Sequence, residues 1–109
     1  ILISLVGSEM CIETVAELCR ELGFRCGKVT VRNSRTRWGS CSSRNDLSLS
    51  LHLMKLPDRL IDYILIHELC HTLHRNHGPA FHALLDRMTG GKHRLLQKEL
   101  RDYSTRWGR

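Results

Sequence analysis

The sequence has 109 residues, of which 17 are Lys or Arg and 11 are Asp or Glu, so its formal net charge is +6 with neutral histidines. Apolar residues make up 41% of the chain and aromatic residues 6%, and the chain has only two prolines. This composition excludes a disordered, collagen-like or low-complexity protein, and the length suits one domain with one core over residues 1–109.

The first predicted element is an amphipathic helix from Ser8 to Leu22. Its apolar side chains recur at helical spacing, Ser8 is a typical N-terminal cap, and Gly23 is a typical residue to end a helix. The apolar stripe consists of Ile12, Val15, Ala16, Cys19 and Leu22. We expect this stripe to face the core.

Three strands are predicted next, and we expect them to form a small antiparallel sheet. Apolar and polar residues alternate in Lys28–Arg32 and in Leu47–His52, which is the pattern of half-buried strands. A further strand is predicted over Arg35–Ser42, and Ser43–Asp46 has the composition of a turn. Leu47–His52 either pairs with an extended peptide or is an interior strand without a free edge.

Three more helices are predicted in the second half of the chain. The first begins at Leu56-Pro57-Asp58, has apolar residues on more than one side, and is expected to be central and buried and to end near His74–Asn76. The next is predicted over Pro79–Met88, before two glycines, and a basic helix follows over Lys92–Tyr103. A helix, then strands, then three helices is the order of an α+β fold.

Cysteine usage and the N-terminus bear on the compartment. The five cysteines are Cys11, Cys19, Cys26, Cys41 and Cys70. Their odd number and the lack of a CxxC pair favour reduced thiols in the cytoplasm and exclude a four-cysteine zinc ribbon. The apolar run Ile1–Val6 is too short to span a bilayer and lacks the basic flank of a signal peptide, so we expect no membrane association. Because the chain begins at Ile1 rather than Met, we expect it to be a piece of a longer protein.

The basic charge is concentrated in two stretches of the sequence. Residues 25–44 carry six basic side chains and no acidic one, and residues 87–109 carry seven against two acidic ones. Such stretches can attract nucleic acid or phosphate, which makes nucleic acid a candidate partner. The alternative is a solvated basic face without a ligand.

The segment with the most chemical content is His67-Glu68-Leu69-Cys70-His71, an HExxH motif on the second helix. Histidines four residues apart project from one helical face, so that two imidazoles can share one Zn²⁺. Glu68 can then lie beside the metal without binding it and take a proton from the metal-bound water. Cys70 is expected to point towards the core. The alternative is a pair of ordinary helix histidines.

Tetrahedral zinc in a catalytic site needs a third protein ligand and an open position for water. His77 is the first candidate, because a chain that turns back after the helix can bring it to the metal from another direction. His82 and then His74 follow as candidates. His74 lies on the same stripe as His67, and three ligands in a line along one helix surround a metal poorly. The spacing of His67, His71 and His77 equals that of the metzincins, but His74 replaces the glycine of that pattern, so we do not assign the chain to them.

Other side chains near the motif have two interpretations each. Arg35 and Arg37 are candidates to bind a substrate carboxylate or phosphate. The alternative is that the two arginines pair with Asp58 or Asp62 while Trp38 anchors the core. Tyr63 either packs, or orients a ligand or stabilises an oxyanion. Asp86 is a candidate to orient a ligand imidazole.

Several of these motifs occur together in a specific order. They are Arg35-Thr36-Arg37-Trp38-Gly39-Ser40-Cys41-Ser42-Ser43, Leu47-Ser48-Leu49, Leu56-Pro57, Ile61-Asp62-Tyr63, the HExxH segment, Asn76-His77-Gly78 and Phe81. In this respect the chain resembles the YgjP-like metal-dependent hydrolases, relatives of the SprT-like and WLM zinc metallopeptidases, over most of its length.

The resemblance implies a zincin-like α+β domain with a three-histidine zinc site. Carried over by position, it makes His67, His71 and His77 the ligands and Glu68 the catalytic carboxylate. Members usually have Trp where this chain has His82, which adds a histidine that is a candidate for contact with substrate. Members are often longer, with a β-rich N-terminal part, so the chain is expected to be the C-terminal part of such a protein.

The sequence therefore predicts a zinc-dependent, metallopeptidase-like hydrolase in which metal-activated water attacks a peptide bond of a peptide or small-molecule substrate. One alternative is a metal-dependent nucleotide pyrophosphatase that holds phosphates with the basic strand region. A more distant alternative is a nucleic-acid-binding module in which zinc only stabilises the fold. A structural zinc site usually has four protein ligands, so a fourth ligand in place of water would exclude the enzyme.

Overall fold

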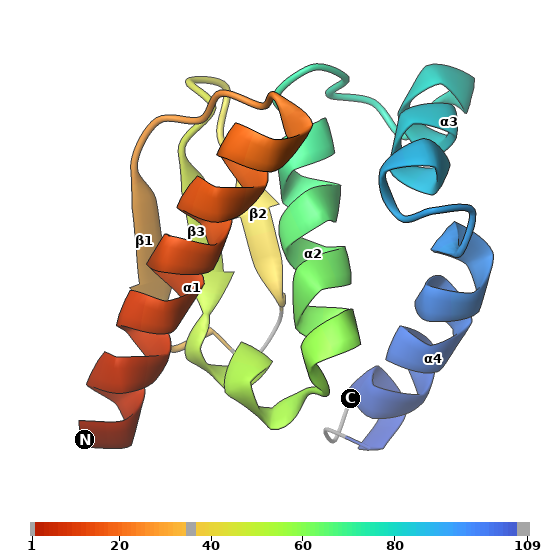
Figure 1. Ribbon diagram of the computed structural model, residues 1–109. Coiled ribbons are helices and arrows are strands. Elements are labelled where there is room, and N and C mark those ends of the chain that lie inside the picture. Colours follow the sequence, from red (N-terminus) through yellow and green to blue (C-terminus); the bar gives the residue numbers. More distant parts are fainter. Residues whose placement is uncertain (1, 35–36, 107–109) are drawn as a thin grey trace.

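The computed structural model describes residues 2–34 and 37–106, and the side chains of residues 12–34 and 37–103. Its elements are α1 (Leu2–Leu22), β1 (Val29–Arg32), β2 (Gly39–Cys41), β3 (Leu47–Ser50), the 3₁₀ helix η1 (Leu51–Lys55), α2 (Asp58–Cys70), α3 (Pro79–Met88) and α4 (His93–Arg106). Helices α1 and α2 lie across one face of the sheet, and α3 and α4 pack beyond α2 (Figure 1). The α+β prediction is confirmed.

Helix α1 ends where the sequence predicts and begins earlier. It already runs from Leu2, so the prediction that Ser8 caps its start is wrong. Gly23 ends it with φ 79°, and the Gly23 N–H donates to the Cys19 carbonyl at 2.9 Å. Val15 is buried and Cys19 packs against the core, whereas Ile12 is 42% exposed, so only part of the predicted stripe faces inwards.

The sheet is mixed, in the order β1-β3-β2, so the prediction of an antiparallel sheet is wrong for one of its two pairs. Strands β2 and β3 are antiparallel, but β1 runs parallel to β3. A tight turn joins β2 to β3, whereas β1 reaches β3 only through the long connection that a parallel pair needs. Strand β3 is therefore the central strand, and the interior-strand alternative for Leu47–His52 is the correct one. Of the predicted strand Arg35–Ser42, only Gly39–Cys41 is a strand, and residues 35–36 lie outside the described ranges.

Helix α2 begins after Pro57 as predicted and ends earlier than predicted. It stops at Cys70 instead of near residues 74–76, because the His71 and Thr72 N–H groups bond to carbonyls three residues back. The Thr72 hydroxyl donates to the Leu69 carbonyl at 2.6 Å and thereby competes with the helical bonding pattern. The chain is consequently free to turn before it reaches His77.

The buried face of α2 explains why its last turns are fixed in place. Leu60, Leu65, Leu69 and Cys70 are each 0% exposed, which confirms both the central position of the helix and the inward direction of Cys70. Burial of one such leucine stabilises the fold by about 1.5–3 kcal/mol. The HExxH segment thus lies on the most firmly packed helix of the described structure.

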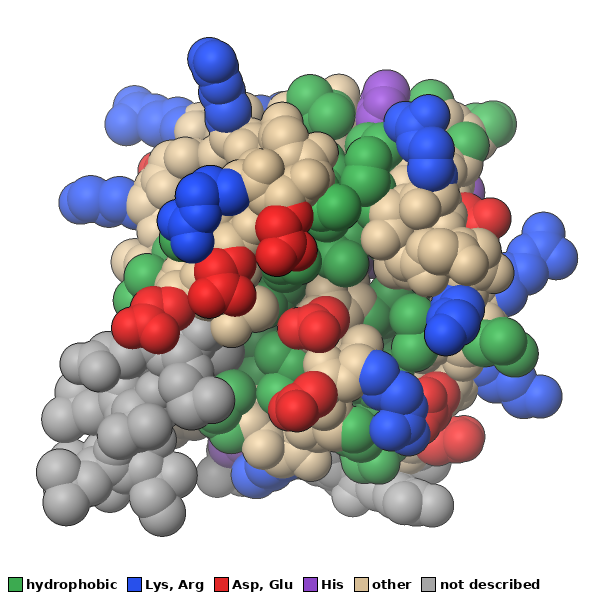
Figure 2. Space-filling model, in the orientation of Figure 1, with side chains coloured by type: hydrophobic (Ala, Val, Ile, Leu, Met, Phe, Trp, Pro, Cys, Tyr) green, Lys and Arg blue, Asp and Glu red, His purple; other side chains and the backbone are tan. Residues whose placement is uncertain are grey.

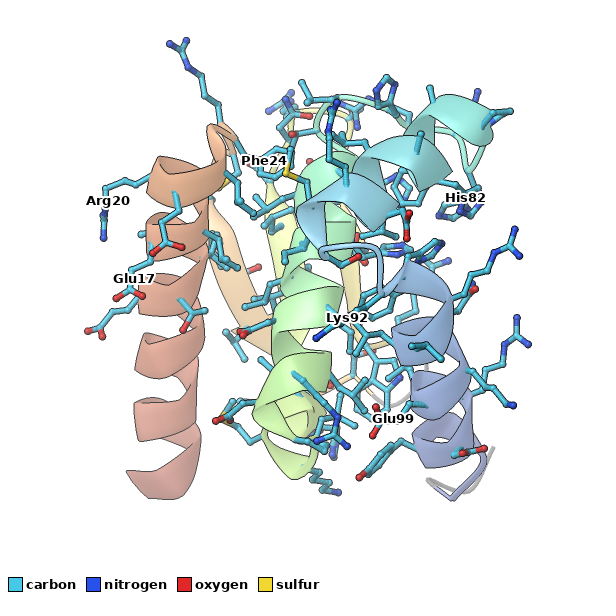
Figure 3. All side chains as sticks on the ribbon, turned by 45° about the vertical axis from the view of Figure 1, so that its right-hand side comes forward. Glu17, Arg20, Phe24, His82, Lys92 and Glu99 are labelled. Carbon is cyan, nitrogen blue, oxygen red and sulfur yellow. The ribbon has the colours of Figure 1, made fainter. Side chains whose placement is uncertain are left out.

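The C-terminal helices complete the layer beyond α2. Helix α3 has the predicted bounds and is followed by Gly90 and Gly91, both with positive φ. Helix α4 runs to Arg106, and its Glu99 pairs with Arg59 of α2 (Figure 3). None of the helices in the described ranges is both long and apolar enough to cross a membrane.

Candidate metal centre

The HExxH histidines project from the end of α2 into a cavity of about 380 Å³. The ring centroids of His67 and His71 are 5.0 Å apart, as expected for side chains separated by about one helical turn. Strand β2 forms the opposite wall. The residues lining the cavity are Arg37, Gly39, Ser40, Cys41, His67, Glu68, His71, Arg75 and His77.

His77 is the histidine that the fold brings to this pair. Its Nε2 lies 3.0 Å from the Nε2 of His71, and one ring nitrogen from each of His67, His71 and His77 lies within 4.8 Å of the other two. His77 reaches them from the segment after α2, so it approaches from outside the helix. The three nitrogens therefore converge on one position, and their role as metal ligands stays a prediction.

One aromatic ring supports all three imidazoles. Phe81, on the first turn of α3, is 1% exposed. Its ring centroid lies 5.1 Å from that of His67, 4.5 Å from that of His71 and 4.8 Å from that of His77. The contact with Phe81 at the start of α3 therefore fixes the planes of the three imidazole rings. The position of Phe81 in the sequence does not reveal this contact.

The protonation of His71 follows from its hydrogen bond to the backbone. Its Nδ1 lies 3.1 Å from the His74 carbonyl oxygen, which can only accept, so Nδ1 carries the proton. The Nε2 that faces His77 is then the nitrogen with the free electron pair. His74 thus contributes its backbone to the site, and its ring is not part of the histidine cluster. Such a bond is the usual way a ligating imidazole is oriented.

Arg75 ties the segment that carries His77 to the hairpin between β2 and β3. Its guanidinium donates to the Ser42 carbonyl at 2.6 Å, to the Ser43 carbonyl at 2.8 Å and to the Asn45 side-chain oxygen at 2.6 Å. Arg75 lies between His74 and His77 in the sequence and also lines the cavity. The sequence gives no signal for this role, because all three acceptors belong to a distant turn.

Glu68 is buried beside the histidines and packed against β2. It is 7% exposed, and a Cβ at Gly39 would lie 3.3 Å from its Cγ, so the strand leaves room for nothing larger than glycine without a shift. Burial raises the pKa of Glu68 to about 7, and the Arg37 guanidinium opposes that rise. The carboxylate is therefore poised to exchange a proton near neutral pH.

Comparison with known proteins agrees with this arrangement. The family model of the YgjP-like metallopeptidase domain matches residues 7–103. The chain belongs to the YgjP-like metallopeptidase family. Among curated proteins and among solved structures, no match was found.

The donor set of this YgjP-like metallopeptidase domain fits a transition metal. Three imidazole nitrogens are typical ligands of such ions, and tetrahedral coordination at ~2.0–2.1 Å places nitrogens about 3.3 Å apart. The 3.0 Å between His71 and His77 is close to that spacing. Burial first, and then the neighbouring imidazoles, lowers the pKa of His67 to about 3, which keeps it neutral as a ligand must be.

Two further histidines of the domain form a hydrogen-bonded chain outside the cluster. The Tyr63 hydroxyl, whose pKa burial raises to about 12, is hydrogen-bonded to Nδ1 of His93 at 3.0 Å. His93 is 6% exposed, and its Nε2 is hydrogen-bonded to Nδ1 of His82 at 3.1 Å. His82 lies where α3 meets α4 (Figure 3). It is therefore held by His93 and is not part of the histidine cluster.

The remaining sequence candidates divide between the cavity and other places. Arg37 lines the cavity, whereas Arg35 lies outside the described residues. Trp38 is half-buried and packs against the core, as its core alternative predicts. Asp86 accepts a hydrogen bond from the His93 N–H at 3.4 Å, so the contact seen here is with His93 rather than with a residue of the histidine cluster.

Proposed function

We propose that this domain is a zinc-dependent peptidase in which a water molecule, activated at the three-histidine position, attacks a peptide bond. The observation that carries the proposal is the convergence of His67, His71 and His77 next to the buried carboxylate of Glu68. Membership of a family described as a metallopeptidase domain supports the same reaction.

The ligand set supports a catalytic rather than a structural metal. Among the described residues, three His side chains meet at the candidate position, and a structural zinc site usually has four protein ligands. When bound, the metal supplies Lewis acidity and lowers the pKa of coordinated water towards ~7. Zinc is proposed because three imidazoles and one open position are typical of catalytic zinc.

Residues of the chain then have separate roles in the reaction. Glu68 takes a proton from the attacking water, because its pKa of about 7 lets it accept a proton and release it again near neutral pH. It passes that proton to the nitrogen that leaves. His71 keeps its orientation through the bond from Nδ1 to the His74 carbonyl.

The edge of the sheet offers a place for an extended substrate. Strand β2 is bonded to β3 on one side, and within the described residues no strand pairs with its other side. Gly39, Ser40 and Cys41 of this strand line the cavity. A peptide added to this edge would pass across the cavity with its backbone held by hydrogen bonds.

The experiment is a comparison of metal content and peptide hydrolysis in four proteins. We expect about one zinc per chain in the wild type, the same content in Glu68→Gln with hydrolysis reduced ~10²–10⁴-fold, and weakened zinc binding in His77→Ala. His82→Ala is the matched control, because His82 is a nearby histidine outside the cluster, and it should keep its zinc. Full hydrolysis by Glu68→Gln would contradict the assignment of the base.

A second candidate reaction is hydrolysis of a phosphoanhydride. The observation in its favour is that two arginines, Arg37 and Arg75, line the same cavity and could hold phosphates. Nucleoside triphosphates should be tested beside the peptides with wild type and Arg37→Ala. Turnover of the nucleotides alone, lost in Arg37→Ala, would favour this reaction over the peptidase.

Nucleic-acid binding has weaker support. On the face drawn in Figure 2, Lys and Arg side chains are scattered over the surface and along its edge and do not gather into one patch on that face. A basic footprint for nucleic acid would be expected to be continuous. Binding of labelled single- and double-stranded DNA at increasing salt would test this alternative.

A further inference from the structure

A second cavity adjoins the candidate metal centre and has a different character. It measures about 270 Å³ and is lined by Arg37, Trp38, Gly39, Tyr63, Ile64, His67, Glu68 and Leu100. Four of these, Arg37, Gly39, His67 and Glu68, also line the metal cavity. The two cavities therefore meet at the proposed base and the first histidine.

The part of this second cavity that is not shared with the metal cavity is apolar. Tyr63 and Ile64 come from α2, Leu100 from α4, and Trp38 from the segment that leads into β2. Tyr63 and Ile64 are each 3% exposed, and Trp38 and Leu100 pack against the core. The Tyr63 hydroxyl is turned to His93, so this residue offers the cavity its ring rather than a free polar group.

We propose that this second cavity, hereafter the apolar subsite, binds a leucine- or phenylalanine-sized side chain of the substrate next to the bond that is cleaved. The proposal rests on the proposed peptidase function. A bond held at the metal centre lies at the junction of the two cavities, so the side chain of a neighbouring residue can enter the second one. Apolar walls with a few polar groups at one end are typical of such a binding pocket.

The volume of the subsite sets the size of the side chain. If each heavy atom takes roughly the 30 Å³ of a water molecule, leucine needs about 120 Å³, phenylalanine about 210 Å³ and tryptophan about 300 Å³. The first two fit into about 270 Å³ and the third does not. One methylene in an apolar pocket changes kcat/KM by about 10–200-fold, so leucine should exceed alanine by at least ~10-fold.

Leu100 is the residue that we expect to set this preference. It is the contribution of α4 to the subsite, and Leu95 on the same helix is 71% exposed and is not among the lining residues. Leu100→Trp should fill the subsite, and Leu100→Ala should enlarge it. Leu95→Trp and Leu95→Ala are the matched controls.

The test measures kcat/KM for peptides that differ only in the residues on either side of the cleaved bond, with Ala, Leu, Phe or Trp at each. We expect the zinc-loaded wild type to prefer Leu and Phe at one of the two positions. Leu100→Trp should bring the ratio of Leu to Ala peptides towards one, and Leu100→Ala should admit Trp. The Leu95 variants should keep the wild-type ratios. Equal rates for all peptides, or a preference that survives both Leu100 changes, would overturn the proposal.

A binding measurement separates this proposal from the proposed function. N-acetyl-phenylalaninamide should shift the NMR signal of the Trp38 indole in the wild type, and Leu100→Trp should abolish the shift. Binding without hydrolysis of any peptide would contradict the peptidase function while supporting an apolar subsite. No shift of Trp38 at millimolar amide would overturn the subsite whatever the peptides show.

Discussion

Replacement of Arg75 by alanine should weaken metal binding. Arg75 makes three hydrogen bonds of 2.6–2.8 Å to the hairpin between β2 and β3. In the sequence, Arg75 directly follows His74, whose carbonyl orients His71, and it lies two residues before His77. Without these bonds, the segment that carries His77 is no longer held against the hairpin.

The magnitude follows from the exposure of these bonds. Arg75 is exposed, so each bond is counted at the lower end of the usual range, ~0.5 kcal/mol, and the three together contribute ~1.5 kcal/mol. Since 1.4 kcal/mol is a factor of ten in an equilibrium constant, metal affinity should fall about 10-fold. Loss of a group that orients a ligand typically costs 10–100-fold, which includes this value.

The assay is competition for Zn²⁺ against a chromophoric chelator, with thermal unfolding of the metal-free protein measured in parallel. Arg44→Ala is the matched control, because Arg44 is an exposed arginine of the same hairpin that does not line the metal cavity. Asn45→Gly removes one acceptor, keeps the positive φ at that position, and should weaken zinc binding less than Arg75→Ala. Equal zinc affinity in Arg75→Ala and Arg44→Ala would refute the reasoning.

Three more outcomes follow from the geometry. Gly39→Ala should shift the Glu68 carboxylate, because the new Cβ would lie 3.3 Å from its Cγ, so hydrolysis should fall while zinc content by metal analysis stays the same. In metal-free protein below pH 6.5, the unfolded chain binds a proton at His67 that the folded chain, with a His67 pKa of about 3, does not bind. Glu68 has the opposite effect between pH 4.5 and 7, because its pKa of about 7 makes the folded chain bind the extra proton, so the test is made in Glu68→Gln. In that variant, urea unfolding should show stability falling as pH drops from 6.5, with His67 contributing at most ~1.4 kcal/mol per pH unit, and adding His67→Phe should make this slope shallower. Leu65→Ala should lower the free energy of unfolding by ~2–5 kcal/mol in the same assay, because Leu65 is buried. Leu95→Ala, at a position 71% exposed, should change it by no more than ~0.5 kcal/mol. Equal effects of the two substitutions would contradict the assigned core.

Local signals predicted the elements that depend on neighbouring residues in the sequence. Helix α3 has its predicted bounds because proline suits the first turn and paired glycines follow the last one. The pairing of His67 with His71 follows from the period of the helix alone. The positions of β1 and β3 are predicted correctly, but their parallel pairing is not, because the sequence of a strand does not show the direction of a partner that follows a long connection.

The early end of α2 explains both an error of prediction and the shape of the candidate site. No glycine or proline marks the end of that helix before Gly78, so apolar spacing alone extends it to residues 74–76. The structure ends it at Cys70, where the Thr72 hydroxyl and the bond from His71 to the His74 carbonyl take over from helical bonds.

The two halves of the candidate site thus depend on different parts of the fold. Helix α2 and its buried leucines place His67, His71 and Glu68, whereas Arg75 and Phe81 place His77 through contacts made after the helix has ended. Changes in the second group should therefore act on metal affinity first and leave the position of the proposed base intact. Changes at Gly39 should displace the proposed base and leave metal affinity intact, because β2 contacts Glu68. A metal-binding defect and a proton-transfer defect can in this way be produced separately in one small domain.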